Sequence, residues 1–466
     1  MKTIKTTLKI YTFLVESTWM LLLSLAVLAC GCDNFTEADP PHSQLSGTVV
    51  FEDIKTADAA MAGIYISMRD GGLLSGSFSG MTYKLGLYAD ELDNYAPGIN
   101  YFHSNSLFAD NSDILDSWTK SYSQLYAVNA VLEGVAASVN LKPQEKDRLR
   151  GEALFLRALL HSCLSNLYGA VPYVQTTDYN VNSRIDKISP AAMAEHITAD
   201  LNEAVLLLPE EYTVAERIRP NRFAAYALLA RVALYGGRWA EAAEAASAVI
   251  NSPQYSLAPV SAVFLKESPE TIWQFQPDGQ GSNTREAQLF IFTSGPPPQT
   301  ALGASLMDAF EPSDQRKPQW TKAVTEGTAV WYHSFKYRER AGTGTSKEYS
   351  IMLRLAEQYL IRAEARAQQG DIIGAGQDLN AIRNRSDLGN TPAATPDEMI
   401  QAVLQERRVE LFTELGHRFF DLKRNNALDA VLQAAKPGWN TYDALWPIPA
   451  QELRANPKLN PQNTGY

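Results

Sequence analysis

The chain has 466 residues, of which 45% are hydrophobic and 20% are charged, and this composition excludes a disordered, collagen-like or many-span membrane protein. With 41 Lys and Arg residues against 52 Asp and Glu residues, the net charge is −11. This charge argues against a nucleic-acid partner, because such a partner is bound by neutralising its phosphates.

The first 32 residues have the pattern of a bacterial lipoprotein signal. Three lysines precede an apolar run at 19–29, which is too short to span a membrane, and Cys30 and Cys32 follow it. A cysteine after Ala or Gly at this boundary is typical of a lipobox, whose thiol receives acyl chains that anchor the protein. We expect lipidation at Cys32, with Cys30 as the alternative, rather than an ordinary cleaved signal with incidental cysteines. Removal of residues 1–31 takes away three lysines and one glutamate and leaves a net charge of −13.

Helical periodicity dominates the mature chain up to residue 208. Apolar residues recur at helical spacing at 56–65, at 118–132, at 149–167 and at 190–208. Residues 70–113 are instead rich in Gly, Ser, Asn, Asp and aromatic residues, which predicts loops on one surface. A mainly α fold with a loop-rich insertion is therefore expected.

A helix, a Gly-containing turn and an Ala-rich second helix are predicted at 223–250. The same pattern recurs 133 positions later, where Tyr359 matches Tyr226 and Gly370 matches Gly237. Such helix pairs resemble the tetratricopeptide unit, which stacks on its neighbours to bury its apolar face. The two repeats are not contiguous in sequence, so we predict a scaffold interrupted by insertions.

The largest insertion covers about residues 252–348. It contains Pro296–Pro298, several Trp and Tyr residues and a β-like run at 271–275, which together predict mixed loops and a small hairpin. Helix returns at 396–424, and the chain ends in an extended tail from Trp446 that is rich in Pro and Asn.

Motifs of metal and catalytic sites are missing from the sequence. The six histidines are scattered without an HExxH or Cys/His pairing, and no P-loop, GxGxxG or GxSxG is present, so neither a cofactor nor an enzyme is predicted. Asp90, Glu91 and Asp93 could hold calcium, but an EF-hand loop needs Gly and Glu where Tyr95 and Tyr101 stand. We expect these acids to solvate a surface loop and not to form a metal site.

A charged run at 406–410, with Arg418, Asp421, Lys423 and Arg424 nearby, could form an anion site. Its opposite charges stand at helical spacing, which favours structural ion pairs over an anion site.

Aromatic residues in the predicted loops are the best candidates for a ligand-binding site. A sugar presents apolar C–H faces and a rim of hydroxyls, so its binder needs exposed aromatic rings flanked by amide or charged groups. Tyr95, Asn100, Tyr101, Trp320 and Trp331 have this composition and are predicted to bind the ligand. The alternative is that these side chains fill gaps between the insertions and the scaffold.

Six ordered motifs, which run over nearly the whole mature chain, resemble the SusD/RagB family of outer-membrane nutrient-binding lipoproteins. Two positions depart from the family pattern: Thr36 replaces a usual Leu, and Ala170 a frequent Asp. The motifs that carry the resemblance are Cys32-Asp33-Asn34-Phe35, the stretch 151–172 with GEALFLRA and YGAVP, 353–365, 406–411, 416–422 and the tail 456–466.

The resemblance implies a signal peptide at 1–31 and one SusD-like domain at 32–466, with loop-rich insertions at about 70–113 and 252–348. It also implies a lipid-anchored protein of the cell outer membrane that faces outward and caps a SusC-like TonB-dependent transporter. Such proteins capture glycans or other nutrients and do no chemistry. Ligand positions vary in the family, so no site residue is carried over.

Two other functions stay open from the sequence. The repeat scaffold could serve as an assembly or interaction module of a lipoprotein that has no small ligand. A surface glycosidase is the second alternative, because the two carboxylates it needs cannot be recognised among so many acids.

Overall fold

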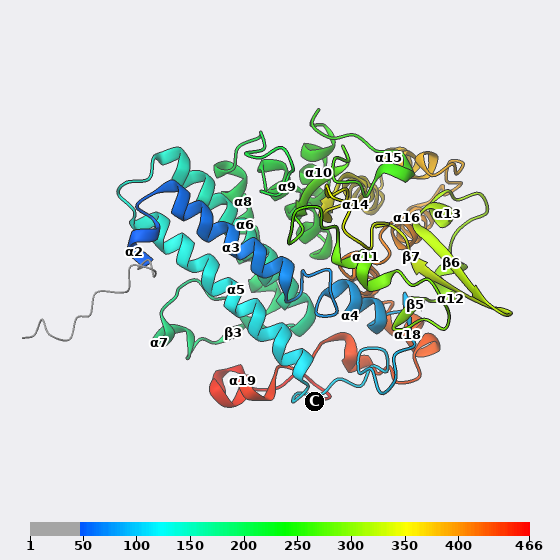
Figure 1. Cartoon of the computed structure of the whole chain (residues 1–466), viewed down its shortest axis with the longest axis horizontal. Helices are drawn as coiled ribbons and strands as arrows, with labels where there is room; N and C mark the ends of the chain where they lie inside the picture. The colour runs from blue at the N-terminus through cyan, green and yellow to red at the C-terminus, as the bar shows by residue number, and fades with distance from the viewer. Residues whose placement is uncertain (1–46) are drawn as a thin grey trace, which may run out of the picture. The chain divides into compact units, whose positions relative to one another are not determined.

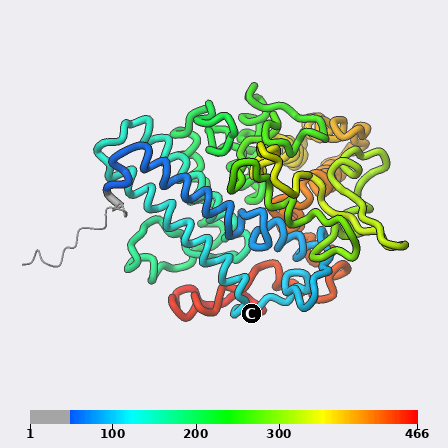
Figure 2. Tube along the Cα trace, viewed as in Figure 1, coloured from blue at the N-terminus to red at the C-terminus, as the bar shows by residue number. Residues whose placement is uncertain are grey.

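The computed structural model describes residues 47–466, so the signal segment with Cys30 and Cys32 lies outside the described residues. The chain divides into two units, residues 1–49 and Val50–Tyr466, and the second holds all the elements discussed below except α2 (Gly47–Val50). About 52% of the chain is helical and the strands are few and small, which confirms the predicted mainly α fold (Figures 1 and 2). None of the described helices is long and apolar enough to cross a membrane.

Long helices packed in succession build the first part of the second unit. α3 (Ile54–Asp70) lies beside α5 (Ser112–Ala137), α5 packs on α6 (Pro143–Tyr168), and α6 packs on α8 (Pro190–Leu207) (Figure 1). Nearly every residue of α6 from Leu149 onward is buried, because helices cover it on several sides. α6 therefore forms the centre of the core.

The predicted internal repeat is confirmed. α9 (Arg222–Tyr235) and α10 (Trp239–Ile250) form the first helix pair, and α14 (Leu355–Gln368) and α15 (Ile372–Arg385) form the second. Gly237 and Gly370 in the two turns have φ of 67° and 83°, a backbone conformation that glycine adopts without strain. α10 packs directly on α14, so the two repeats adjoin in space although about a hundred residues separate them.

The insertion at 70–113 contains more helix and strand than predicted. The insertion at about 252–348 contains about as much as predicted. α4 (Met81–Tyr88) lies within the first, and all eight of its residues are buried, so a surface-loop assignment is wrong there. Four antiparallel strand pairs occur in the described part of the chain. These are β1 (Leu92–Asn94) with β5 (Thr300–Leu302), β2 (Val171–Pro172) with β3 (Lys187–Ile188), β4 (Thr271–Phe275) with β8 (Ser350–Arg354), and the hairpin β6 (Thr321–Glu326) with β7 (Ala329–Ser334).

The remaining elements are mostly short. They are α2 (Gly47–Val50), α7 (Tyr179–Asn182), α11 (Arg285–Phe290), α12 (Ala304–Met307), α13 (Arg316–Trp320), α16 (Pro396–Glu410), α17 (His417–Arg424), α18 (Leu428–Ala435) and α19 (Ala450–Ala455). Within residues 47–466 there are also 3-10 turns at Val260–Ala262, Thr441–Ala444 and Pro457–Leu459.

The charged run of α16 forms structural ion pairs, as predicted. Glu410 is fully buried and accepts hydrogen bonds from Arg354 at 2.6 Å, Arg385 at 2.6 Å and Arg316 at 2.9 Å. Arg316 also pairs with Glu406. The three arginines compensate the buried Glu410 carboxylate for its lost hydration. Because these arginines come from α13, β8 and α15, the cluster ties those elements to α16.

The same cluster predicts a loss of stability in acid. Although burial raises it, the three arginines around Glu410 hold the pKa of that carboxyl well below its ordinary value. A group whose pKa is depressed on folding stabilises the protein above its unfolded pKa, and this contribution is lost as the pH falls. We expect Glu410→Gln to lower the free energy of unfolding most at pH 7 and less with each step below about pH 4.5. Urea unfolding between pH 7 and pH 3.5 measures this, with the exposed Glu211→Gln as control; a difference from wild type that does not change with pH would contradict it.

Candidate ligand-binding surface

The loop after β1 and the second strand of the hairpin bring two of the predicted rings together. β1 pairs with β5, and the backbone N–H groups of Tyr95 and Ala96 both donate to the Gln299 carbonyl oxygen, at 2.7 and 3.1 Å. β5 packs in turn against β7, which carries Trp331 (Figure 1). The Trp331 side chain lies beside the Tyr95 hydroxyl, close enough to act on the pKa of that group. We call these two residues the Tyr95–Trp331 pair.

The Tyr95–Trp331 pair is accessible to solvent and held from behind. Tyr95 is 39% exposed, and Trp331 is half-buried. The indole lies against Gly295, where an added Cβ would come within 2.2 Å of Trp331 Cζ3. Burial and the Asp93 carboxylate raise the pKa of the Tyr95 hydroxyl, which is therefore neutral at physiological pH. Supported rings with a neutral hydroxyl beside a carboxylate fit the face and the hydroxyl rim of a sugar.

A second aromatic pair lies in the same loop. Tyr101 and Phe108, 37% and 43% exposed, contact each other edge to face, with ring centroids 5.2 Å apart. The loop between them is fixed by Phe102, which is buried against Trp446, and by Asn105, whose amide donates to the Tyr88 carbonyl oxygen at 3.0 Å. We call these two exposed rings the Tyr101–Phe108 pair.

Asn100 has a structural role within the loop. Its side-chain oxygen accepts the backbone N–H groups of Phe102 and His103, both at 3.1 Å. These bonds hold the turn that presents Tyr101. A direct contact between Asn100 and a ligand stays a prediction.

Trp320 is wrongly predicted as a ligand contact. Its side chain is only 1% exposed, and its indole N–H donates to the Val260 carbonyl oxygen at 2.8 Å. Phe264 packs edge to face on the ring, and the amine of Lys336 lies 5.0 Å from its centroid. Trp320 thus belongs to the core between the insertion and the scaffold, because the α13–β6 junction turns it inward.

Two of the three acids before Tyr95 are not solvated by water, contrary to the expectation from the sequence. Asp90 is buried and pairs with Arg408 at 2.8 Å and Arg418 at 2.7 Å. Glu91 is also buried, and burial raises the pKa of its carboxyl to about 8. Asp93 is exposed beside the Tyr95–Trp331 pair. Within residues 47–466, no group of three or more His, Cys, Asp or Glu side chains is arranged to hold a metal ion.

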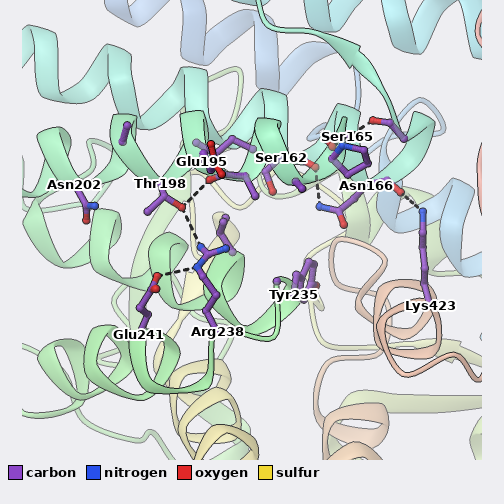
Figure 3. A pocket seen from close by; sticks show the side chains of 18 of the residues that line it. Ser162, Ser165, Asn166, Glu195, Thr198, Asn202, Tyr235, Arg238, Glu241 and Lys423 are labelled. Carbon is purple, nitrogen blue, oxygen red and sulfur yellow. Dashed lines mark hydrogen bonds and ion pairs between the residues drawn. The ribbon is translucent and has the colours of Figure 1, made fainter. Parts of the chain in front are cut away.

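A cleft of about 880 Å³ lies in the helical scaffold, among residues that the sequence does not single out (Figure 3). Its walls come from α6, α8, the α9–α10 turn and α17, and it shares no lining residue with either aromatic pair. Only one sequence signal points to it: Ser162 and Asn166, four residues apart, are polar positions on the apolar helix α6. Its other residues come from segments that only the fold brings together.

Comparison with known proteins agrees with this architecture. A protein-family model described as starch-binding and associating with the outer membrane matches residues 91–234, and the SusD family model matches residues 313–466. SusD-like protein P38 from Formosa agariphila is 24% identical, and the alignment covers 97% of this chain and 99% of the relative. SusD-like protein P2 from the same organism is 26% identical over 96% and 98% of the two chains.

Solved structures show the same fold. A SusD superfamily protein from Bacteroides vulgatus has a TM-score of 0.78 at 21% identity, over 89% of this chain and 99% of that one. A laminarin-binding SusD-like protein has a TM-score of 0.75 at 23% identity, over 88% and 99%. Surface glycan-binding protein A from Bacteroides uniformis has a TM-score of 0.73 at 19% identity, over 88% and 99%. With its stacked helix pairs, its small strands and both family matches, the chain belongs to the SusD/RagB family.

Proposed function

We propose that this protein captures glycans at the cell surface and delivers them to a partner TonB-dependent outer-membrane transporter, without catalysis. The observation that carries the proposal is the Tyr95–Trp331 pair, in which two rings from distant segments stand on a fixed backbone. Sugar recognition by such rings agrees with the laminarin-binding and surface glycan-binding proteins that share the fold.

The proposed ligand surface consists of Tyr95, Tyr101 and Trp331, with Asn100 holding the loop. Phe108 joins this set from the structure, because it packs on Tyr101 and is exposed. A panel of polysaccharides in native affinity gels, run with residues 33–466, tests the proposal. Retardation by at least one glycan, with the glycan recovered intact, is expected; binding to none of a broad panel, or turnover of the bound glycan, would contradict it.

Lipidation at Cys32 places the protein at the outer membrane in this proposal. The apolar run that ends in small residues and cysteine is the substrate pattern of a lipoprotein signal peptidase. Mass spectrometry of the mature protein should find an acylated N-terminal Cys32, and a Cys32→Ala/Cys30→Ala variant should lose membrane association. An unmodified N-terminus beyond residue 32 would contradict the prediction.

The partner is proposed to be a SusC-like TonB-dependent transporter that this protein covers as a lid. Support comes from the family match, whose description includes association with the outer membrane, and from the broad helical surface of the repeats. Affinity purification from membranes in mild detergent should recover a large barrel protein in near-equal amount. Recovery of this lipoprotein alone, while other outer-membrane complexes stay intact, would contradict the lid model.

A further inference from the structure

The cleft of Figure 3 has the size of a site for a small ligand. Its volume of about 880 Å³ is within the range of roughly 300–1,000 Å³ for small-molecule pockets. Ser162 and Asn166 of α6 line one side, Glu195 of α8 lies on the same wall, and Tyr235 of α9 faces them across the opening. Because four elements of the rigid scaffold form the walls, the cleft exists without a ligand-induced change.

One end of the cleft holds an amine without an acid. Lys423 reaches from α17 toward α6, and its Nζ donates to the Asn166 carbonyl oxygen at 2.6 Å (Figure 3). No ion pair among residues 47–466 involves Lys423, which corrects the expectation that the whole charged cluster forms ion pairs. Burial lowers the pKa of this amine to about 7. Lys423 is half-buried, and a cation that is partly shielded from water without a counter-charge is costly. An anionic ligand would remove that cost.

The basic residues next to Lys423 differ from it, because each of them has an acid partner. Arg424 pairs with Glu364, and Arg407 pairs with Asp421 at 2.7 Å. At the other end of the cleft, Arg238 is already neutralised by Glu241, with Nε to Oε2 at 2.8 Å. Lys423 is therefore the cation left for a ligand in this cleft, within the part of the chain that the structure describes.

Several uncharged polar groups face the same space. The Ser162 hydroxyl and the Asn202 amide make no hydrogen bond within residues 47–466, whereas Thr198 accepts a bond from Arg238 Nη2 at 2.9 Å. The Asn166 amide nitrogen donates to the Ser162 carbonyl oxygen at 2.8 Å. The side-chain oxygen of Asn166 is left as an acceptor. Hydroxyl and amide groups around one amine match a ligand that carries several hydroxyls and one acid group.

We propose that this cleft is a second ligand site that takes a carboxylate-bearing sugar, such as a uronate unit, with the carboxylate paired to Lys423 and the hydroxyls bonded to Ser162 and Asn166. Tyr235 borders the site with its ring. This site is separate from the Tyr95–Trp331 pair and does not depend on the function proposed there.

Two matched sugars test the proposal by calorimetry on residues 33–466. Cellobiouronic acid and cellobiose differ only by the carboxylate, and propionate supplies a carboxylate without hydroxyls. We expect the uronate to bind at least about tenfold more tightly than either of the others, and Lys423→Met to abolish that preference. Lys458→Met, at an exposed lysine paired with Asp186, is the control that should keep it. Equal binding of the two sugars, binding of neither, or binding of propionate as tight as the uronate would overturn the proposal.

A second measurement needs no variant and covers the case in which Lys423→Met fails to fold. Lysine acetylation of the wild-type protein, read by peptide mass spectrometry, should be slowed at Lys423 by cellobiouronic acid and not by cellobiose. The Tyr95→Ala/Trp331→Ala protein should show the same protection, because its lost rings lie in the other site. Acetylation of Lys423 at an unchanged rate with the uronate present would overturn the proposal.

Discussion

Replacing Arg354 with methionine is expected to lower the free energy of unfolding by about 3–5 kcal/mol. Arg354 is 2% exposed and bonds three carboxylates, with Nη1 at 2.6 Å from Glu410 and 3.0 Å from Glu270, and Nε at 2.7 Å from Glu414. Methionine fills a similar volume but leaves these acids short of positive charge in the core. Urea unfolding followed by circular dichroism at pH 7 measures the loss.

The matched control is Arg454→Met. Arg454 lies 3.8 Å from Asp110, and both side chains are about 70% exposed, so the pair is screened by water and contributes about 0–1 kcal/mol. If Arg354→Met changes stability no more than this control does, the buried cluster is not what ties β8 to α16. The comparison isolates burial, because both variants remove one guanidinium.

The Tyr95→Ala/Trp331→Ala variant is expected to bind the captured glycan at least about tenfold more weakly than wild type. Each stacking ring contributes on the order of 1 kcal/mol, and 1.4 kcal/mol corresponds to a tenfold change in affinity. Tyr95 is exposed and Trp331 is half-buried on a hairpin strand outside the core, so the variant is expected to fold. Affinity gels and calorimetry with the glycan identified from the panel measure the change, and unfolding curves check the fold.

Tyr179→Ala is the matched control for that experiment. Tyr179 is 79% exposed on α7 and takes part in neither aromatic pair, so its removal should leave binding unchanged. Tyr101→Ala tests separately whether the Tyr101–Phe108 pair extends the same surface. If the double variant folds and binds as tightly as wild type, the Tyr95–Trp331 pair is not the ligand site.

Periodicity in the sequence predicts the scaffold well, because helix pairs are local structures. The repeat at 223–250 and its copy from 355 onward follow from the spacing of Ala, Tyr and Gly, and the structure places both as predicted. The charges of α16 form structural ion pairs as expected, but their partners come from α13 and β8 and not from helical spacing within α16. α4 is missed, because its buried residues lie between Gly- and Ser-rich turns that suggest loops.

The candidate site is decided by contacts between distant segments. Composition selects Tyr95, Trp320 and Trp331 equally, since all three are aromatic residues in or beside predicted loops. Only the pairing of β1 with β5 and the packing of β5 on β7 bring Tyr95 to Trp331. The α13–β6 junction turns Trp320 into the core instead.

The sequence by itself determined the mainly helical fold, the repeat and the family, because these depend on local periodicity and on ordered motifs. Tertiary structure alone decided which rings face solvent and that Lys423 stands without an acid in a cleft. The physical reason is that exposure and charge compensation depend on neighbours far away in the chain. Two residues of the same type therefore end in different environments: Trp331 lies at the surface beside Tyr95, and Trp320 lies in the core.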